Sequence, residues 1–130
     1  MAQTHEQRLG RWGENVAGFY LEARGFHILA RNVRTPHGEV DLVASSAPAG
    51  APGILVFVEV KTRSSAGFGL PEEAVDERKL EHLFRAAEAY MQEHPDLAGH
   101  EWRIDVIAIQ GKPGEKVEDV DIQHFENISA

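Results

Sequence analysis

Two short apolar segments of the chain carry acidic residues that could bind a divalent cation. The first, residues 38–44, contains Asp41, and the second, residues 54–61, contains Glu59. Both are rich in β-branched and apolar residues, and small turn-forming residues connect them, so we expect two strands of a hairpin. Pairing symmetric about Gly50 would place Asp41 opposite Glu59, with their Cβ atoms roughly 4.5–5.5 Å apart.

Strand alternation would put Glu39 and Asp41 on one face of the sheet, with Val40 and Leu42 on the other. Two carboxylates held as close as Asp41 and Glu59 repel each other, which strongly raises one pKa. A divalent cation would offset this repulsion, because Mg²⁺ prefers one or two carboxylates together with water and phosphate oxygens. Lys61 follows Glu59 by two residues, so it lies on the same face and would be beside the ion.

That order, Asp41 and then Glu59-Val60-Lys61, resembles the metal-dependent PD-(D/E)XK nuclease superfamily, which includes restriction enzymes and archaeal Holliday-junction resolvases. Nearly the whole chain is similar to the YraN family of small bacterial proteins. The residues that carry this likeness are Gly13-Glu14, 31–34, 38–42, 56–63, Phe68-Gly69, Lys79, His124 and Asn127. The resemblance implies an α/β, restriction-endonuclease-like fold and phosphodiester hydrolysis in nucleic acid.

Glu14 has two interpretations. From spacing alone, a solvated helix residue paired with Arg11 is favoured. The resemblance implies instead a supporting catalytic role, since related nucleases place a glutamate of the first helix beside the metal site. The internal glycines near Glu14, each costing roughly 0.5–1 kcal/mol relative to alanine, would let the helix approach the sheet or let substrate reach the carboxylate.

The remaining pattern predicts a mixed sheet flanked by helices in the order αβββαββ, within a single nuclease-like domain over 1–130. A capping-box pattern begins the first helix, which ends at Gly25, and Asp76 is a good N-cap for a second helix that ends near Glu93. The other expected elements are strands over 26–33 and 102–109, an edge strand within 117–125, and a Gly/Ser-rich segment, 62–69, near the substrate.

Composition fits a protein of the cytoplasm. The chain has 130 residues and no cysteine, which excludes disulfides and thiolate metal sites, and its apolar runs are too short to span a membrane. The seven histidines lack the spacing of a zinc site. The polar N-terminus does not have the pattern of a signal peptide.

A net charge of −8 is unusual for a protein that binds nucleic acid. The charge is uneven: residues 1–63 hold seven Lys/Arg and six acids, whereas the remainder holds six and fifteen. The predicted site thus lies in the half with local cations, although weak, salt-sensitive binding is expected. The candidates for substrate contact are Arg31, Arg34, Arg63, Lys79, Glu39 and His37, with solvated surface charge as the alternative for Arg31, Arg34 and Lys79.

We therefore expect a Mg²⁺- or Mn²⁺-dependent endonuclease that acts on DNA rather than RNA, with Asp41, Glu59 and the Val60 carbonyl as metal ligands. Lys61 would orient the attacking water and stabilise the transition state. One alternative is a nucleic-acid-binding accessory protein with little turnover, and another is a protein-interaction module. A cross-strand ladder of salt bridges is the structural alternative. A junction-resolving role would favour a homodimer.

Overall fold

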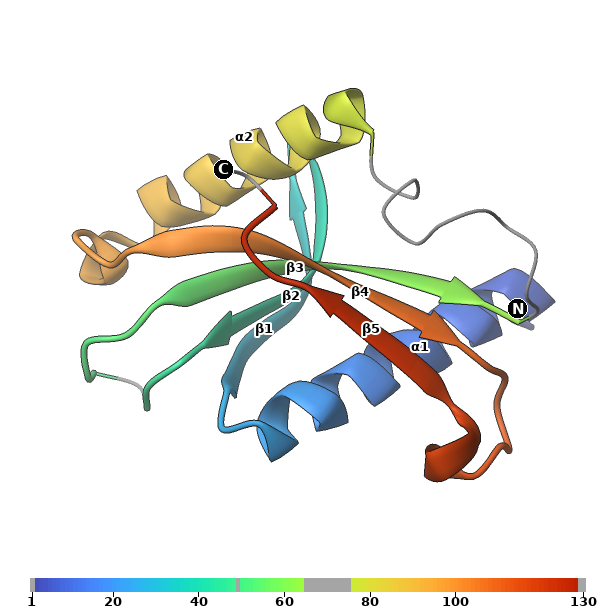
Figure 1. The fold of residues 1–130 in the computed structure, drawn as a ribbon. Coiled ribbons are helices and arrows are strands. Elements are labelled where there is room, and N and C mark those ends of the chain that lie inside the picture. The colour runs from blue at the N-terminus through green and yellow to red at the C-terminus, as the bar shows by residue number, and fades with distance from the viewer. Residues whose placement is uncertain (1, 49, 65–75, 129–130) are drawn as a thin grey trace.

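A computed structural model describes residues 2–48, 50–64 and 76–128 of the chain. Within these residues, two long helices, five strands and two short 3₁₀ helices follow one another (Figure 1). In chain order they are α1 (His5–Ala23), β1 (His27–Thr35), β2 (Gly38–Ser45), β3 (Leu55–Arg63), α2 (Glu77–Glu93), η2 (Pro95–Leu97), β4 (Trp102–Gln110), η3 (Val117–Asp119) and β5 (Asp121–Phe125). Most of the Gly/Ser-rich segment expected near the substrate, 65–69, lies outside the described residues.

The five strands form one mixed sheet in the order β1-β2-β3-β4-β5. Neighbouring strands are antiparallel except β3 and β4, which run parallel over the whole length of β3. A parallel pair needs a crossover connection, and α2 lies in that connection. The expected mixed α/β sheet and the order αβββαββ are confirmed.

Both helices begin at the predicted caps. Thr4 Oγ1 accepts a hydrogen bond from Gln7 N at 3.0 Å, and Gln7 Oε1 accepts one from Thr4 N at 2.9 Å, which completes the capping box. Asp76 Oδ1 accepts from Lys79 N at 2.8 Å at the start of α2. These bonds satisfy backbone donors that have no partner within the helix, so local sequence alone determines where each helix starts.

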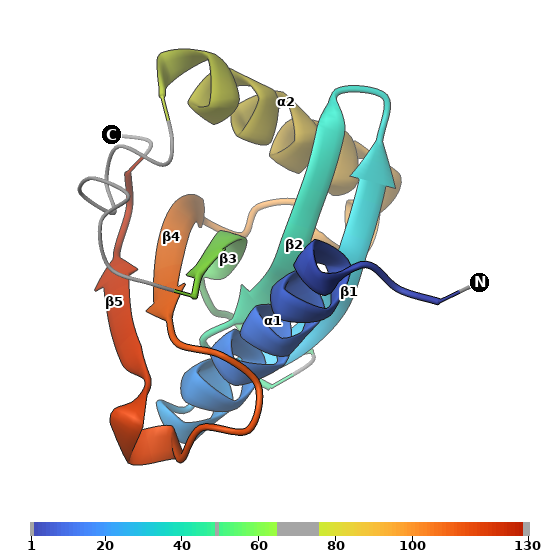
Figure 2. The ribbon, with the colours of Figure 1, turned by 90° about the vertical axis from the view of Figure 1, so that its right-hand side faces the viewer.

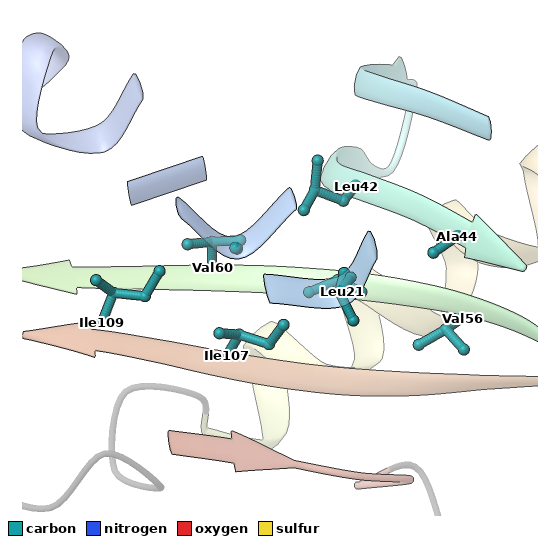
Figure 3. Packing of buried hydrophobic residues seen from close by; sticks show 9 residues of the cluster. Leu21, Leu42, Ala44, Val56, Val60, Ile107 and Ile109 are labelled. Atoms are coloured by element: carbon teal, nitrogen blue, oxygen red, sulfur yellow. The ribbon is translucent and has the colours of Figure 1, made fainter. Parts of the chain in front are cut away.

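The helices cover opposite faces of the sheet, each over its own apolar cluster (Figures 1 and 2). Leu21 of α1 packs among side chains of β2, β3 and β4, as Figure 3 shows. The other cluster joins Leu83 and Tyr90 of α2 to Phe57 of β3. Because β3 is buried on both faces, its apolar run has no polar alternation until Glu59.

Strict alternation along β2 was a wrong prediction. Val40 belongs to the α2 cluster, whereas Leu42, two residues on, belongs to the α1 cluster. The neighbouring position of β1 is irregular as well: Asn32 has a left-handed backbone with φ of 51°. Such conformations are uncommon outside glycine and are enriched at Asn and Asp.

Within the residues described by the structure, no helix is long and apolar enough to cross a membrane.

Candidate active site

The predicted acids lie where two strands of the sheet separate. β2 and β3 pair in the predicted register, but their pairing extends only to Leu42 and Val58. Beyond that point β2 stays paired with β1, while β3 continues alongside β4 (Figure 1). The prediction that Asp41 and Glu59 form a directly opposed pair in the ladder was therefore wrong. Instead, Asp41 Oδ2 accepts a hydrogen bond from Val60 N at 2.7 Å.

A pocket of about 550 Å³ lies at this separation. Its lining brings together the four predicted catalytic residues, Glu14, Asp41, Glu59 and Lys61. The rest of the lining comes from α1 and from the end of β3: His5, Glu6, Leu9, Gly10, Val60, Thr62, Arg63 and Ser64. The acids and the lysine thus face one shared volume, although they are far apart in the sequence.

Burial makes the carboxylates of this pocket unusually basic. Burial, followed by the charge of Glu59, raises the pKa of Asp41 to about 7. Burial also raises the pKa of Glu59, against the opposing effects of Lys79 and Lys61. In the metal-free protein, both carboxylates are therefore harder to ionise than an exposed acid would be.

Lys79 contacts an acid of the site. Its Nζ atom lies 3.2 Å from Glu59 Oε1, and the side chain of Glu59 is only 7% exposed. The hydrogen bond between the Asp76 cap and Lys79 N fixes the first turn of α2 at this point. The predicted phosphate contact of Lys79 is untested, and the structure gives this lysine a carboxylate partner.

Asn32 forms hydrogen bonds to two further acids, Glu14 of α1 and Glu39 of β2. With its amide nitrogen toward the carboxylates, it donates to Glu14 Oε1 at 2.9 Å and to Glu39 Oε1 at 3.3 Å. The hydrogen-bond partner of Glu14 is therefore Asn32 rather than Arg11. Burial raises the pKa of Glu14, and the bond from Asn32 counteracts that rise. The sequence reasoning did not identify Asn32 as a site residue.

Glutamate 14 reaches the pocket because α1 lies directly on β3. A Cβ atom added at Gly13 would overlap the Thr62 side chain, so only glycine permits this approach. A Cβ atom at Gly18 would lie 2.7 Å from the Arg31 guanidinium. The close approach of this helix to the sheet is therefore seen at Gly13, whereas the neighbour of Gly18 is the end of a flexible side chain.

The basic residues predicted to contact substrate lie at different distances from the pocket, and most are not part of its lining. Arg63 lines the pocket. Arg31 is exposed beside Gly18, and Arg34 is exposed on the β1–β2 hairpin, opposite Glu39. His37 lies in the exposed turn of that hairpin, where its backbone N donates to Thr35 Oγ1. Of these four side chains, only Arg63 is among the lining residues.

The donor set is small and hard. Among the described residues, no three His, Asp or Glu side chains are placed to hold one ion. Asp41 and Glu59 offer two carboxylates, and burial is the largest cause of their raised pKa values. Two carboxylates, a backbone carbonyl and water suit Mg²⁺ or Mn²⁺.

A second polar network lies in the sheet, away from the pocket. Asp105 is fully buried, and its Oδ2 atom lies 2.7 Å from His124 Nε2. Tyr20 of α1 hydrogen-bonds the other ring nitrogen at 3.0 Å, and Arg103 Nε donates to Asp105 Oδ1 at 3.0 Å. Although burial would raise the pKa of Asp105, bonds from His124, the backbone N of Asn127 and Arg103 hold it below its usual value. This network links α1, β4 and β5.

Comparison with known proteins gives a consistent family match. A model of "Uncharacterised protein family UPF0102" matches residues 13–109. A UPF0102 protein of Beutenbergia cavernae is 50% identical over 101 residues, which cover 78% of this chain and 80% of that protein. A UPF0102 protein of Syntrophotalea carbinolica is 43% identical over 117 residues, covering 90% and 87%.

Two solved structures are similar at a greater distance. One is described as a repair endonuclease from Pyrococcus abyssi, with a TM-score of 0.47 and 17% identity; the match covers 92% of this chain and 43% of that one. The other is SfsA of Pyrococcus furiosus in complex with Ca²⁺, with a TM-score of 0.40 and 14% identity; the match covers 91% of this chain and 62% of that one. Inferences about chemistry therefore depend on the pocket itself.

Proposed function

We propose that this chain is a metal-dependent nuclease that hydrolyses phosphodiester bonds in nucleic acid. The chain belongs to the uncharacterised protein family UPF0102, the YraN-like family that its motifs predicted. One observation carries the proposal. Asp41, Glu59 and Lys61 line a single pocket where β2 and β3 separate, and the pKa of Asp41 there is raised to about 7. A carboxylate pair beside an ammonium group is suited to bind a cation and a phosphate.

Each residue of the pocket has a distinct task. Asp41 and Glu59 would hold the ion together with the Val60 carbonyl, while the bond from Val60 N keeps the Asp41 carboxylate in place. Lys61 would orient the attacking water and stabilise negative charge on the phosphoryl oxygens. Arg63, at the mouth of the same pocket, would bind a flanking phosphate.

Glu14 would not bind the metal directly but would act on a nearby water molecule. Its hydrogen bond from Asn32 fixes the carboxylate toward the pocket, and burial raises its pKa, so it can accept a proton from water. When bound, Mg²⁺ or Mn²⁺ would supply the activation of water and the neutralisation of phosphate charge.

An accessory protein that binds nucleic acid with little turnover is the second candidate. The ion pair between Lys79 and Glu59 favours it, because one proposed ligand already has a cationic partner. The net charge of −8 also favours weak binding.

For the proposed nuclease, DNA is preferred to RNA as the substrate, and resolution of a branched DNA would require a two-fold homodimer.

Incubation with Mn²⁺ and a panel of labelled substrates tests the proposal: single-stranded, duplex and branched DNA, and RNA. We expect the wild-type protein to cleave at least one of them and Asp41→Asn to cleave none. Asp119→Asn removes the same charge from an exposed site outside the pocket, so it should retain activity. Gel-shift binding without cleavage would favour the accessory protein. A chain that neither binds nor cleaves would disprove both candidates.

A further inference from the structure

Three glycines interrupt α1, and two of them have close neighbours. Gly13 and Gly18 are buried; an added Cβ atom at Gly13 would collide with Thr62, and one at Gly18 would displace the end of the Arg31 side chain. Gly10 is different, because no described atom lies within 4 Å of the Cβ position. A helix-interior glycine is less favourable than alanine, so packing within the described structure gives no reason for glycine at this position.

Gly10 nevertheless lies at an informative place. It precedes Glu14 by four residues, which puts the two on the same face of α1. Both line the pocket that contains Asp41. Because Cα–Cβ bonds in a helix tilt toward its N-terminus, a side chain at Gly10 would extend along the pocket wall toward Glu6. It would occupy space between α1 and the end of β3.

We infer that Gly10 keeps open the path along which a nucleic-acid strand reaches the carboxylates, and that it is a substrate-access residue. This inference rests on the proposed nuclease function. The backbone of a strand bound at Asp41 must leave the pocket past the surfaces that line it, and those are the first turns of α1 on one side and Thr62, Arg63 and Ser64 on the other. Glycine removes the side chain nearest to Glu14 on the helix side.

The test compares stability with substrate binding. Gly10→Ala should raise Tm by roughly 3 °C, because alanine favours the helix. Gly10→Leu should keep Tm at or above the wild-type value and weaken binding by about tenfold or more, with a matching rise in KM. Binding is measured by fluorescence anisotropy in Ca²⁺, using the fluorescein-labelled DNA oligonucleotide that the wild-type protein cleaves fastest in the panel above.

Asn15→Leu provides the matched control. Asn15 is exposed on α1 and is not among the lining residues, so the same leucine there should leave binding and KM unchanged. Wild-type binding by Gly10→Leu would overturn the inference while leaving the nuclease proposal intact. A lowered Tm in Gly10→Ala would also overturn it, since packing would then explain the glycine. Failure of the wild-type protein to bind or cleave any substrate would disprove the proposed function and this inference with it.

Discussion

Asparagine at position 41 should make the metal-free protein more stable at alkaline pH. The amide oxygen of Asp41→Asn can still accept the hydrogen bond from Val60 N, so the substitution removes the charge and keeps the contact. In the wild-type protein, burial and the charge of Glu59 raise the pKa of Asp41 from 3.8 to about 7. The folded state therefore binds this proton more tightly than the unfolded state does.

The sign and size of the effect follow from that shift. A carboxyl with a raised pKa lowers the free energy of unfolding progressively as pH rises from about 4 to about 7, and the loss is complete above pH 7. A shift from 3.8 to about 7 corresponds to about 4 kcal/mol in total, of which roughly 2.5 kcal/mol falls between pH 5 and pH 8. For a domain of this size, that difference corresponds to about 10 °C in Tm.

The assay is chemical or thermal denaturation in EDTA at pH 5 and pH 8. Wild-type and Asp119→Asn proteins should lose roughly 2.5 kcal/mol more stability than Asp41→Asn between these pH values. Addition of Mn²⁺ at pH 8 should stabilise the wild-type protein and have little effect on Asp41→Asn, because the ion replaces the missing countercharge. This readout is independent of cleavage.

Equal pH dependence in wild type and Asp41→Asn would refute the reasoning. It would mean that the Asp41 carboxylate is already neutralised in the folded protein. A destabilised Asp41→Asn at pH 8 would lead to the same conclusion, since ionised Asp41 would then be a stabilising group.

Three further substitutions separate the roles of neighbouring residues. Lys61→Ala should abolish cleavage while stabilisation by Mn²⁺ at pH 8 remains, because the lysine is not a ligand; unchanged cleavage would exclude its catalytic role. Asn32→Gly tolerates the left-handed backbone but loses the bonds to two acids, so cleavage should fall by roughly tenfold with little change in Tm. Asp105→Asn should cost about 3 kcal/mol of unfolding free energy in urea denaturation, because Arg103 and His124 lose a buried ionised partner. An unchanged stability of Asp105→Asn would show that the network contributes nothing to the fold.

Local signals in the sequence were sufficient for the elements and for most of the site. The cap pairs at Thr4 and Asp76 determine both helix starts, and the apolar run of β3 marks a central strand. The register of the hairpin also followed from its symmetry about Gly50, since Leu42 pairs with Val58. These features could be predicted because each depends on residues that are close together in the sequence or on the geometry of a single turn.

The departures from expectation arise from tertiary geometry. Period-2 alternation could not indicate that the pairing of β2 with β3 ends at Leu42, because the alternation of side chains along one strand carries no information about where a partner strand diverges. An asparagine in a strand also gives no signal of a bond to two acids, although its place within the quoted family motif could have suggested one. Likewise, Lys79 meets Glu59 only because α2 crosses the sheet, which spacing along the chain does not show.

Close contact between Gly13 and Thr62 has a consequence for how the pocket is held in shape. Since the backbone of α1 at Gly13 rests directly on the Thr62 side chain of β3, a shift of the helix relative to the strand would also disturb the apolar cluster beneath it. Glu14 is the next residue along that helix, so the distance between its backbone and the strands that carry Asp41 and Glu59 is set by this packing. Hydrophobic burial elsewhere in the molecule thereby preorganises the backbone positions from which mutually repelling acids project.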